Sequence, residues 1–552
     1  MSFLRQSCLA AMVTVMTASL AQAHFIWIVT KPAEKPEKLE VYFGEAAIPD
    51  DPELLGNIEG IEAWGFGGRR AEPRQLKLEK GDDAYVATIP ENLQSSPIVA
   101  KFNYGRIARG DAAFVLKYYA KTYPSVVPAS WKAVENEEIL PLEVTPELQE
   151  GELVFTVRWK GERVSGSQVT AYGPKMDQVQ GETDENGTYR VTPGAAGLYE
   201  VRARMIENQS GEVDGKPYSD IRHYSTLTFH YSPEQLKSVQ HDWPAMEKGT
   251  TSFGAAVVGD HLYVYGGHYG QAHHYSQEGQ SGDFQRLNLT GGDWETLPGG
   301  PKLTGLGMMP YNGKLYRVGG FTAKNTDDED ESLWSQDSFA RFDPETKEWE
   351  TLPSLPEGRS SHDVAIVGDT LYVVGGWKLQ GDEETEWHDT ALAVDLSADQ
   401  LEWKEIPQPP FHRRALSLAE WNDKLYVIGG MQQEGGITQE TAVYDPATQS
   451  WSEGPALLGT GMDGFGTAAF SCNGHLFVST MSGSVLRLSN DGSAWEYVGR
   501  LENPRFFHRQ VPWNGELVFV GGADMAVGKL EGLERMPIQQ PDAQSDSTAS
   551  LK

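Results

Sequence analysis

One pattern of residues recurs along the second half of the chain, and its clearest copy begins RSSHDVAIVGDTLYVVGG (Arg359–Gly376), followed by TALAVDL (Thr390–Leu396) and WKEIP (Trp403–Pro407). Each copy ends its second apolar run on a glycine pair, at 266–267, 319–320, 375–376, 429–430 and 521–522, and Ser479-Thr480 takes this place in one further copy. The first residues of these pairs are 53, 56, 54, 50 and 42 positions apart. Short alternating runs at this period predict a repeated four-stranded unit. Such a unit cannot bury both faces alone, so the copies are expected to stack around an axis.

The copies resemble kelch repeats, whose marks are the apolar–Tyr–Val–apolar–Gly–Gly run, a Tyr/Phe-Asp-Pro turn and a tryptophan soon after it. KLYVIGG (424–430), TAVYDP (441–446) and Trp451 show all three. Six copies imply a six-bladed kelch β-propeller over residues 236–537. We expect the preceding linker, Ser232 to Met246, to add an outer strand to the short last copy and so close the ring, because closure removes exposed strand edges.

The composition of the chain excludes some classes of binding partner. The 552 residues carry 78 acidic and 46 basic side chains, a formal net charge of −32. This balance argues against nucleic acid or an anionic membrane as partner. Of the two cysteines, Cys8 and Cys472, the first lies in a segment that we expect to be removed, so no internal disulfide is expected.

Residues 1–23 have the features of a secretory signal, with basic Arg5, a short apolar run and the small-x-small site Ala21-Gln22-Ala23. The run is too short to span a bilayer, and no later segment is long and apolar enough. We therefore expect an exported, soluble protein, periplasmic or secreted. The last residues, 538–552, are polar and are expected to be disordered.

Between the signal and the propeller, the chain reads as two β-sandwich units, 24–145 and 146–235. Alternating runs from Glu152 and a turn at Glu185–Gly187 predict an immunoglobulin-like or transthyretin-like unit in the second. The first is β-rich, with a short helix expected near residues 112–121. The fold class is thus all-β: N-terminal β-sandwich units followed by a six-bladed kelch β-propeller.

Cleavage after Ala23 would leave His24 as the first residue, and its α-amine and Nδ1 could chelate a transition metal such as Cu(II) or Ni(II). HFIWI (24–28), VYFGE (41–45) and HYSTLTF (223–229) resemble a domain family of unknown function linked to periplasmic nickel and cobalt uptake. The resemblance implies metal capture (Ni, Co or Cu) and a metal-uptake system as partner. His223 and His230 are further candidate ligands, although seven residues of separation place them on opposite faces of a regular strand.

A second candidate site lies at the mouth of the propeller. Arg359, Arg413 and Arg505 each stand 16 residues before the first residue of a glycine pair, and His362 and His508 stand 13 before. These equivalent positions could present a ring of cations to an acidic glycan or protein ligand. The alternative is that the arginines make structural hydrogen bonds within the propeller.

The sequence favours binding over catalysis: metal capture through His24, with the propeller as a recognition platform for a protein or glycan. An enzyme is the rival, either a carbohydrate-active propeller or a copper histidine-brace oxidase. Galactose-oxidase-like copper chemistry needs a Tyr–Cys cross-link near the axis, and Cys472 is expected in a hairpin at the opposite face. A third hypothesis is a structural adhesion or interaction module that binds nothing small.

Overall fold

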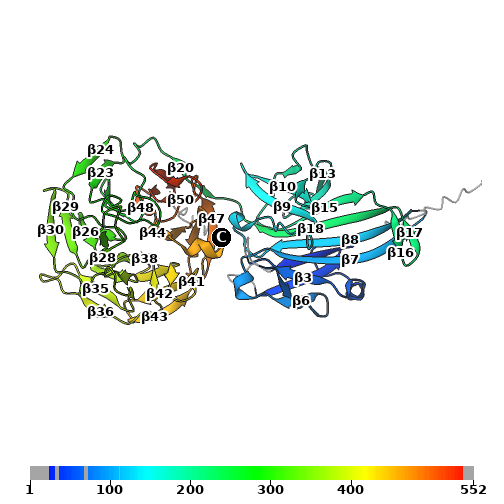
Figure 1. Ribbon diagram of the computed structural model, residues 1–552, viewed down its shortest axis with the longest axis horizontal. Helices are drawn as coiled ribbons and strands as arrows, with labels where there is room; N and C mark the ends of the chain where they lie inside the picture. The colour runs from blue at the N-terminus through cyan, green and yellow to red at the C-terminus, as the bar shows by residue number, and fades with distance from the viewer. Residues whose placement is uncertain (1–23, 31–36, 68–71, 111, 539–552) are drawn as a thin grey trace, which may run out of the picture.

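The computed structural model describes residues 24–30, 37–67, 72–110 and 112–538. It consists of two β-rich lobes side by side, a sandwich lobe from the N-terminal half and a ring of blades from the C-terminal half (Figure 1). The expected signal segment, 1–23, and all but the first residue of the expected tail lie outside the described residues. Ile538, the first residue of that tail, is buried. None of the helices in the described ranges has the length and apolarity needed to cross a membrane.

The sandwich lobe contains one large sheet and two smaller ones. The large sheet has the order β13-β12-β15-β18-β8-β7-β3-β4, and the smaller ones are β1-β2-β6-β5 and β11-β10-β14 with β9 paired to β10. The strands are β1 (Phe25–Thr30), β2 (Lys38–Gly44), β3 (Glu62–Gly65), β4 (Arg74–Leu76), β5 (Glu79–Lys80), β6 (Tyr85–Thr88), β7 (Ile98–Arg109), β8 (Ala112–Tyr123), β9 (Leu142–Gln149), β10 (Glu152–Trp159), β11 (Glu162–Arg163), β12 (Gln168–Tyr172), β13 (Val179–Glu182), β14 (Thr188–Val191), β15 (Gly197–Glu207) and β18 (Asp220–Tyr231). A separate hairpin, β16 (Gly211–Val213) with β17 (Lys216–Tyr218), and three short 3-10 turns, η1 (Pro52–Ile58), η2 (Glu91–Leu93) and η3 (Pro128–Ser130), complete the lobe.

The eight-stranded sheet crosses the boundary that the sequence placed at residue 145, because β18 pairs in parallel with β8. The short helix expected near 112–121 is wrong: this segment is β8, paired along its length with β7 and β18. Its side chains are buried on both faces for most of the strand. A strand buried on both faces loses the apolar–polar alternation by which strands are recognised, which explains the error.

Side chains of β18 fasten β1 across the sandwich. The hydroxyl groups of Thr226 and Thr228 donate to the backbone carbonyls of Ile26 and Ile28. Every side chain of β1 is buried. The segment that follows His24 is therefore a core strand, held by polar contacts at every second residue.

The ring contains six blades, each built on four antiparallel strands with strand a innermost and strand d outermost (Figure 1). Taken from a to d, they are blade 1, β21 (Gly254–Val258), β22 (His261–Tyr265), β23 (Phe284–Asn288), β24 (Trp294–Leu297); blade 2, β25 (Gly307–Tyr311), β26 (Lys314–Val318), β29 (Phe339–Asp343), β30 (Glu348–Leu352); blade 3, β31 (Asp363–Val367), β32 (Thr370–Val374), β35 (Ala391–Asp395), β36 (Lys404–Ile406); blade 4, β38 (Ser417–Trp421), β39 (Lys424–Ile428), β42 (Thr441–Asp445), β43 (Ser450–Gly454); blade 5, β44 (Ala468–Cys472), β45 (His475–Ser479), β46 (Ser484–Leu488), β47 (Trp495–Arg500); and blade 6, β48 (Arg509–Trp513), β49 (Glu516–Val520), β52 (Glu534–Pro537), β20 (Val239–Gln240).

The linker closes the ring, as the sequence predicted. Strand β20 supplies the outer strand of blade 6, and β19 (Leu236–Lys237) pairs in parallel with the outer strand of blade 5. The two lobes also share apolar contacts beside this linker. Val127, next to η3, is fully buried in one cluster with Trp421, Trp495 and Tyr497 of the propeller.

The b–c and d–a connections share one end of the ring, which we call the loop face. Several of these connections carry short strands of their own: β27 (Phe321–Ala323) with β28 (Leu333–Ser335), β33 (Trp377–Lys378) with β34 (Glu386–Trp387), β37 (Arg413–Arg414) with β40 (Met431–Gln432) and β41 (Gly436–Ile437), and β50 (Ala523–Asp524) with β51 (Gly528–Lys529). A 3-10 turn, η4 (Gly461–Gly464), precedes blade 5.

One ion pair spans the axis of the ring just inside the loop face. Arg509 of blade 6 donates to the carboxylate of Asp363 in blade 3 (2.9 Å) and to the backbone carbonyls of Phe253 and Leu306, which precede strands a of blades 1 and 2. The other oxygen of Asp363 accepts from the backbone N–H of Leu418 in blade 4 (3.0 Å). This pair thus joins five of the six blades.

We predict that Asp363→Ala destabilises the ring, because it leaves the guanidinium of Arg509 without its charged partner. The side chain of Arg509 is 24% exposed and that of Asp363 is 9% exposed. Loss of a largely buried partner is expected to lower the free energy of unfolding by about 2–4 kcal/mol. Urea unfolding followed by tryptophan fluorescence measures it. The control Glu350→Ala breaks the exposed Arg341–Glu350 pair and should cost under about 1 kcal/mol; equal losses would contradict the prediction.

Candidate functional site

The three arginines predicted at the mouth of the propeller lie inside its blades. Arg359 donates to the carbonyls of Gly375 (3.0 Å) and Thr390 (2.9 Å) and is 2% exposed. Each of the three guanidinium groups binds within its own blade. Its acceptors are backbone carbonyls at the end of strand b or next to strand c, or a carboxylate on or next to strand c. We call this arrangement the arginine clamp.

Arg413 and Arg505 show the charged form of the clamp. Arg413 donates to the backbone carbonyl (3.1 Å) and the carboxylate of Glu440. Arg505 donates to the carbonyl of Gly521 (3.1 Å) and pairs with Glu534, and both of these side chains are almost wholly buried. Desolvation lowers the pKa of both arginines, and the neighbouring carboxylate opposes that shift. Such contacts match the structural alternative; ligand binding by these arginines stays a prediction.

The two histidines of the same set are also interior. His362 and His508 are each 3% exposed, and burial holds the pKa of each well below its ordinary value. The Nε2 atom of His508 lies 2.7 Å from the hydroxyl of Ser479 in the preceding blade. His508 therefore contributes to the contact between blades 5 and 6.

A different group of side chains is presented at the loop face. Phe465, Phe506 and Phe507 form a partly exposed aromatic cluster, with ring centroids 4.8–6.1 Å apart. Phe506 pairs through its backbone with Ala523, at the base of the β50–β51 hairpin. The tip of that hairpin carries Met525 and Val527, which are 75% and 72% exposed. We call these five residues the loop-face patch.

This patch is not among the sites predicted from the sequence. The signal that could have found it is two adjacent phenylalanines, Phe506-Phe507, in a d–a connection, followed by apolar residues in a b–c connection. Apolar residues that are exposed on the connections of a rigid ring, and are not needed for packing, often mark binding sites. Phe507 has φ of 51°, a conformation that non-glycine residues rarely adopt, and it is held there by neighbours at the axis.

Two hollows lie away from this patch, one along the axis of the propeller and one between the lobes. The channel along the axis holds about 200 Å³ and is lined by Met308, Val364, Phe470 and Arg509, among others. An open cleft of about 1060 Å³ lies between the lobes, with Phe66 and Lys132 on one wall and Met462 on the other.

His24 begins the described chain beside β1. Its backbone carbonyl accepts from the hydroxyl of Tyr118 (2.8 Å), and its Nε2 lies 3.6 Å from the carboxylate of Asp50. Its ring centroid lies 5.6 Å from that of Phe43. The residue is thus fixed by its main chain, with one carboxylate within reach of the imidazole.

The other two candidate metal ligands are placed apart from His24. His223 contacts the hydroxyl of Tyr119 through Nδ1 (3.1 Å) and Glu207 through Nε2 (3.3 Å), and burial lowers its pKa to about 4. His230 contacts the backbone carbonyl of Thr30, at the far end of β1 from His24. Within the described ranges, no three His, Cys, Asp or Glu side chains gather as a metal-holding group. Any metal at His24 would need ligands beyond these imidazoles.

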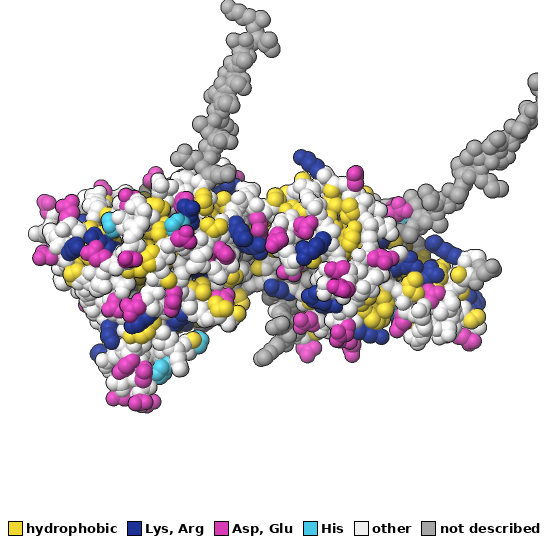
Figure 2. All heavy atoms as spheres, turned by 90° about the horizontal axis from the view of Figure 1, so that it is seen from above, with side chains coloured by type: hydrophobic (Ala, Val, Ile, Leu, Met, Phe, Trp, Pro, Cys, Tyr) yellow, Lys and Arg dark blue, Asp and Glu magenta, His cyan; other side chains and the backbone are white. Residues whose placement is uncertain are grey.

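Acidic side chains are spread over both lobes on the face seen in Figure 2, and no single basic patch gathers there. This distribution fits the net charge of −32. A field of this sign favours cationic or neutral partners over polyanions.

Comparison with known protein families identifies the repeats. The "Kelch motif" family matches residues 249–301, and the "KLHDC2/KLHL20/DRC7 Kelch-repeats domain" family matches residues 305–522. The C-terminal half is therefore a kelch β-propeller, as its glycine pairs predicted.

Curated relatives match over the same half. "Kelch-like protein terF" of Aspergillus terreus is 28% identical over 203 residues, which are 36% of this chain and 43% of that protein. "Kelch-like protein 35" of Mus musculus is 31% identical over 150 residues, 27% of this chain and 22% of that protein. The chain thus spans less than half the length of these relatives. A solved structure described as "Structure of YjhT" covers 54% of this chain and 97% of its own, at 16% identity and a TM-score of 0.44.

Buried histidines make the propeller sensitive to acid. His388 is 8% exposed, its Nε2 contacts the carbonyl of Gly358 (3.1 Å), and burial together with nearby Arg359 lowers its pKa to about 4. An unfolded histidine titrates near ~6.5. Because the folded value is the lower one, this stability is complete above pH ~6.5 and is lost as pH falls toward 4.

We predict that His388→Gln, which keeps a donor for Gly358, makes the free energy of unfolding fall less steeply between pH ~6.5 and 4, by up to about 1.4 kcal/mol per pH unit. Urea unfolding across that range measures it. His273→Gln, at an exposed loop position, is the control. The same slope in wild type and His388→Gln would refute the assignment.

Proposed function

We propose that this protein is an interaction module whose propeller binds a protein partner through the loop-face patch. The observation that carries the proposal is the exposure of Met525 and Val527 beside the phenylalanine cluster on a rigid ring. Protein interfaces are rich in aromatic residues and methionine at their centres. The kelch relatives support the proposal only as far as the fold, since fold does not fix function.

The chemistry of the patch favours a protein over a glycan. Glycan sites need several polar groups that converge on hydroxyls, whereas the patch offers phenyl rings, a thioether and an isopropyl group. The arginines that could have held an acidic sugar are engaged inside the blades. The net charge of −32 would favour a partner whose contact surface has basic residues at its rim.

We predict that the double variant Met525→Asp, Val527→Asp loses this partner, because two charges would have to be desolvated at the centre of the contact. Purified protein with a cross-linker captures partners from extracts of its own source, and mass spectrometry compares variants. The control Tyr172→Asp changes an exposed apolar residue of the sandwich lobe, which is 49% exposed. A specific partner should be retained by wild type and control and fall at least ~10-fold with the double variant.

A capture profile unchanged by the double variant would overturn the proposed surface. Thermal melting of the same variants shows that folding is intact, because substitutions at exposed hairpin tips usually change stability by less than about 0.5 kcal/mol.

As a second function, we propose transition-metal capture at His24 in an exported protein cleaved after Ala23. The observation in its favour is Asp50, whose carboxylate faces the Nε2 of His24. An amine and Nδ1 could bind Ni, Co or Cu while Nε2 donates to Asp50, the outer-shell arrangement common at metal-bound imidazoles. His223 and His230 take no part in this form of the proposal.

We predict one-to-one binding of Cu(II) or Ni(II) to protein that begins at His24, measured by calorimetric titration. Asp50→Asn should weaken binding by about 10–100-fold. Protein with an acetylated His24 amine is the control and should lose the site, since the chelate needs a free amine. Equal affinity in free and acetylated protein, or none in either, would exclude it.

A further inference from the structure

The arginine clamp has an equivalent position in every blade, 16 residues before the first residue of the glycine pair. Blades 3, 4 and 6 have arginine there. Blade 2 has Leu303, fully buried in an apolar cluster, and blade 5 has Asp463, which accepts from Thr480 and Ser482. Blade 1 has Thr250, whose short side chain donates back to the carbonyl of Lys248 (2.9 Å). Blade 1 therefore lacks a side chain long enough to cross from this position to strand c.

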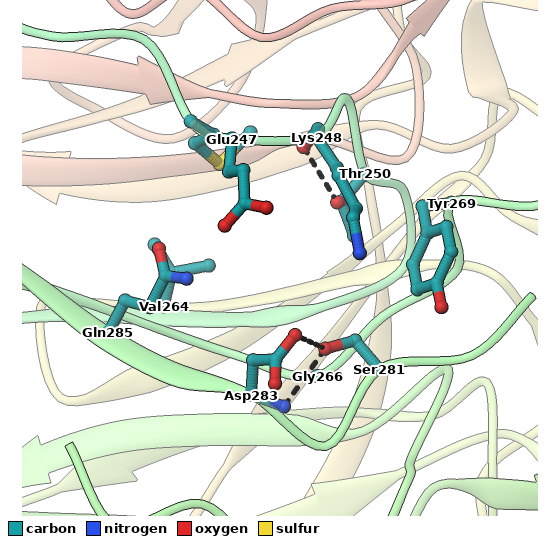
Figure 3. A pocket seen from close by; sticks show the side chains of 10 residues that line it. Glu247, Lys248, Thr250, Val264, Gly266, Tyr269, Ser281, Asp283 and Gln285 are labelled. Atoms are coloured by element: carbon teal, nitrogen blue, oxygen red, sulfur yellow. Dashed lines mark hydrogen bonds between the residues drawn. The ribbon is translucent and has the colours of Figure 1, made fainter. Parts of the chain in front are cut away.

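A cavity occupies the place of the missing side chain. It holds about 50 Å³, and the residues that line it include Thr250, Gly266, Ser281 and Asp283 together with Glu247, Lys248 and Tyr269 (Figure 3). One water-sized sphere needs about 10–15 Å³. The cavity therefore has room for a polar group larger than one water molecule.

The walls of this cavity match the acceptors of the clamps. The carbonyls of Gly375 and Gly521 accept from Arg359 and Arg505, and Gly266 is their counterpart in blade 1. Asp283 corresponds to Glu440: in each case the first glycine of the pair donates its N–H to the carbonyl of this residue, which directly precedes strand c. Glu440 is the carboxylate that pairs with Arg413. Blade 1 thus keeps the carboxylate and the carbonyl of a clamp without its arginine.

We propose that this cavity, the blade-1 socket, binds a guanidinium group supplied by an arginine side chain of a protein partner. That the arginine comes from a protein partner rests on the proposed function. That the cavity binds a guanidinium group rests on the contacts of the three arginine clamps. The socket lies beside the loop-face patch, because Gly249 packs against Lys529 at the end of the β50–β51 hairpin. One partner could fill the socket with arginine while its apolar residues cover Met525 and Val527.

The charges at the socket favour a cation with several donors. Among the residues that line the socket, the two carboxylates of Asp283 and Glu247 outnumber the ammonium of Lys248, which lies 4.4 Å from the ring centroid of Tyr269. Ser281 donates to Asp283 (2.8 Å) and orients its carboxylate (Figure 3). A planar guanidinium can bond a carboxylate and a carbonyl together, as Arg413 and Arg505 do, whereas an ammonium ion presents a point charge.

Methyl NMR of protein labelled at the methionine methyl groups tests the socket, because Met246 lines it and Met525 marks the patch. The ligand is Nα-acetyl-arginine methylamide, with Nα-acetyl-lysine methylamide and free arginine as comparisons. We expect a saturable shift of the Met246 signal, with Kd on the order of 1 mM as befits a fragment. The lysine compound should bind about tenfold more weakly, and free arginine should bind less well than the blocked form because its own carboxylate meets two others.

Two variants locate the binding. Thr250→Arg restores a clamp in blade 1, so it should abolish the response and raise the melting temperature. Asp283→Asn should weaken binding about tenfold, through loss of a charge-assisted bond, while Asp293→Asn, exposed in the same blade and away from the socket, should not. The proposal is overturned by an unmoved Met246 signal, by equal affinity for the lysine compound, or by an affinity for the arginine compound that is unchanged in Asp283→Asn.

This outcome is separable from that of the proposed function. If the Met246 signal moves but no captured partner depends on Met525 and Val527, the socket stands and the interaction surface fails. If a partner is captured through the patch and the Met246 signal stays fixed, the surface stands and the socket fails.

Discussion

The ring depends on one backbone contact repeated from blade to blade. The second glycine of each pair donates its N–H to a backbone carbonyl in the next blade, which belongs to the residue at the clamp position or to its neighbour. This contact is made by Gly267, Gly320, Gly376, Gly430 and Gly522, with N···O distances of 2.7–2.9 Å. At Gly375, the first glycine of such a pair, φ is 75° and an added Cβ would lie 2.7 Å from the carbonyl oxygen of Arg413 in the next blade. Only glycine permits this approach, so the glycine pairs that reveal the fold in the sequence are also the joints that hold it.

The same joint fixes where other groups lie. Because the clamp residue gives its carbonyl to the preceding blade, its side chain turns back into its own blade, as Arg359 and Arg505 do. Two residues further on, the d–a connections meet at the axis in the left-handed conformation and donate to one another, as Ser361 does to Gly305 and Ala415 does to Ser361. These contacts, together with the Arg509–Asp363 pair, leave the loop face rigid. A rigid frame of this kind lowers the entropy cost of presenting a binding surface.

The sequence was informative where a residue type has one physical explanation. Paired glycines at a fixed period predicted the blades, and the short final copy predicted that the linker supplies β20. The sequence was uninformative where one residue type can have either a structural or a ligand-binding role. Arg359 has the spacing of a clamp and of a ligand-binding ring, and only its contacts distinguish them. The sequence of β8 does not indicate a strand, because burial on both faces removes the apolar–polar alternation by which strands are recognised. The loop-face patch depends on two connections meeting in space, which spacing along the chain does not encode.

Function in a repeat protein is most readily sought where a copy departs from its siblings, because residues that every blade shares are explained by the fold. Three departures lie together at the junction of blades 6 and 1. Phe507 places a partly exposed phenyl ring at a left-handed position where the other blades have serine, alanine or glycine. Met525 and Val527 extend a hairpin into solvent, and Thr250 replaces the clamp. Each is unfavourable or neutral for the stability of an isolated ring: a large aromatic side chain and apolar surface exposed to solvent, and a cavity with its carboxylate in place. Their proximity is what a binding site would require and what the repeat alone does not, so the boundary between the first and last blades is where this ring differs most from a purely structural one.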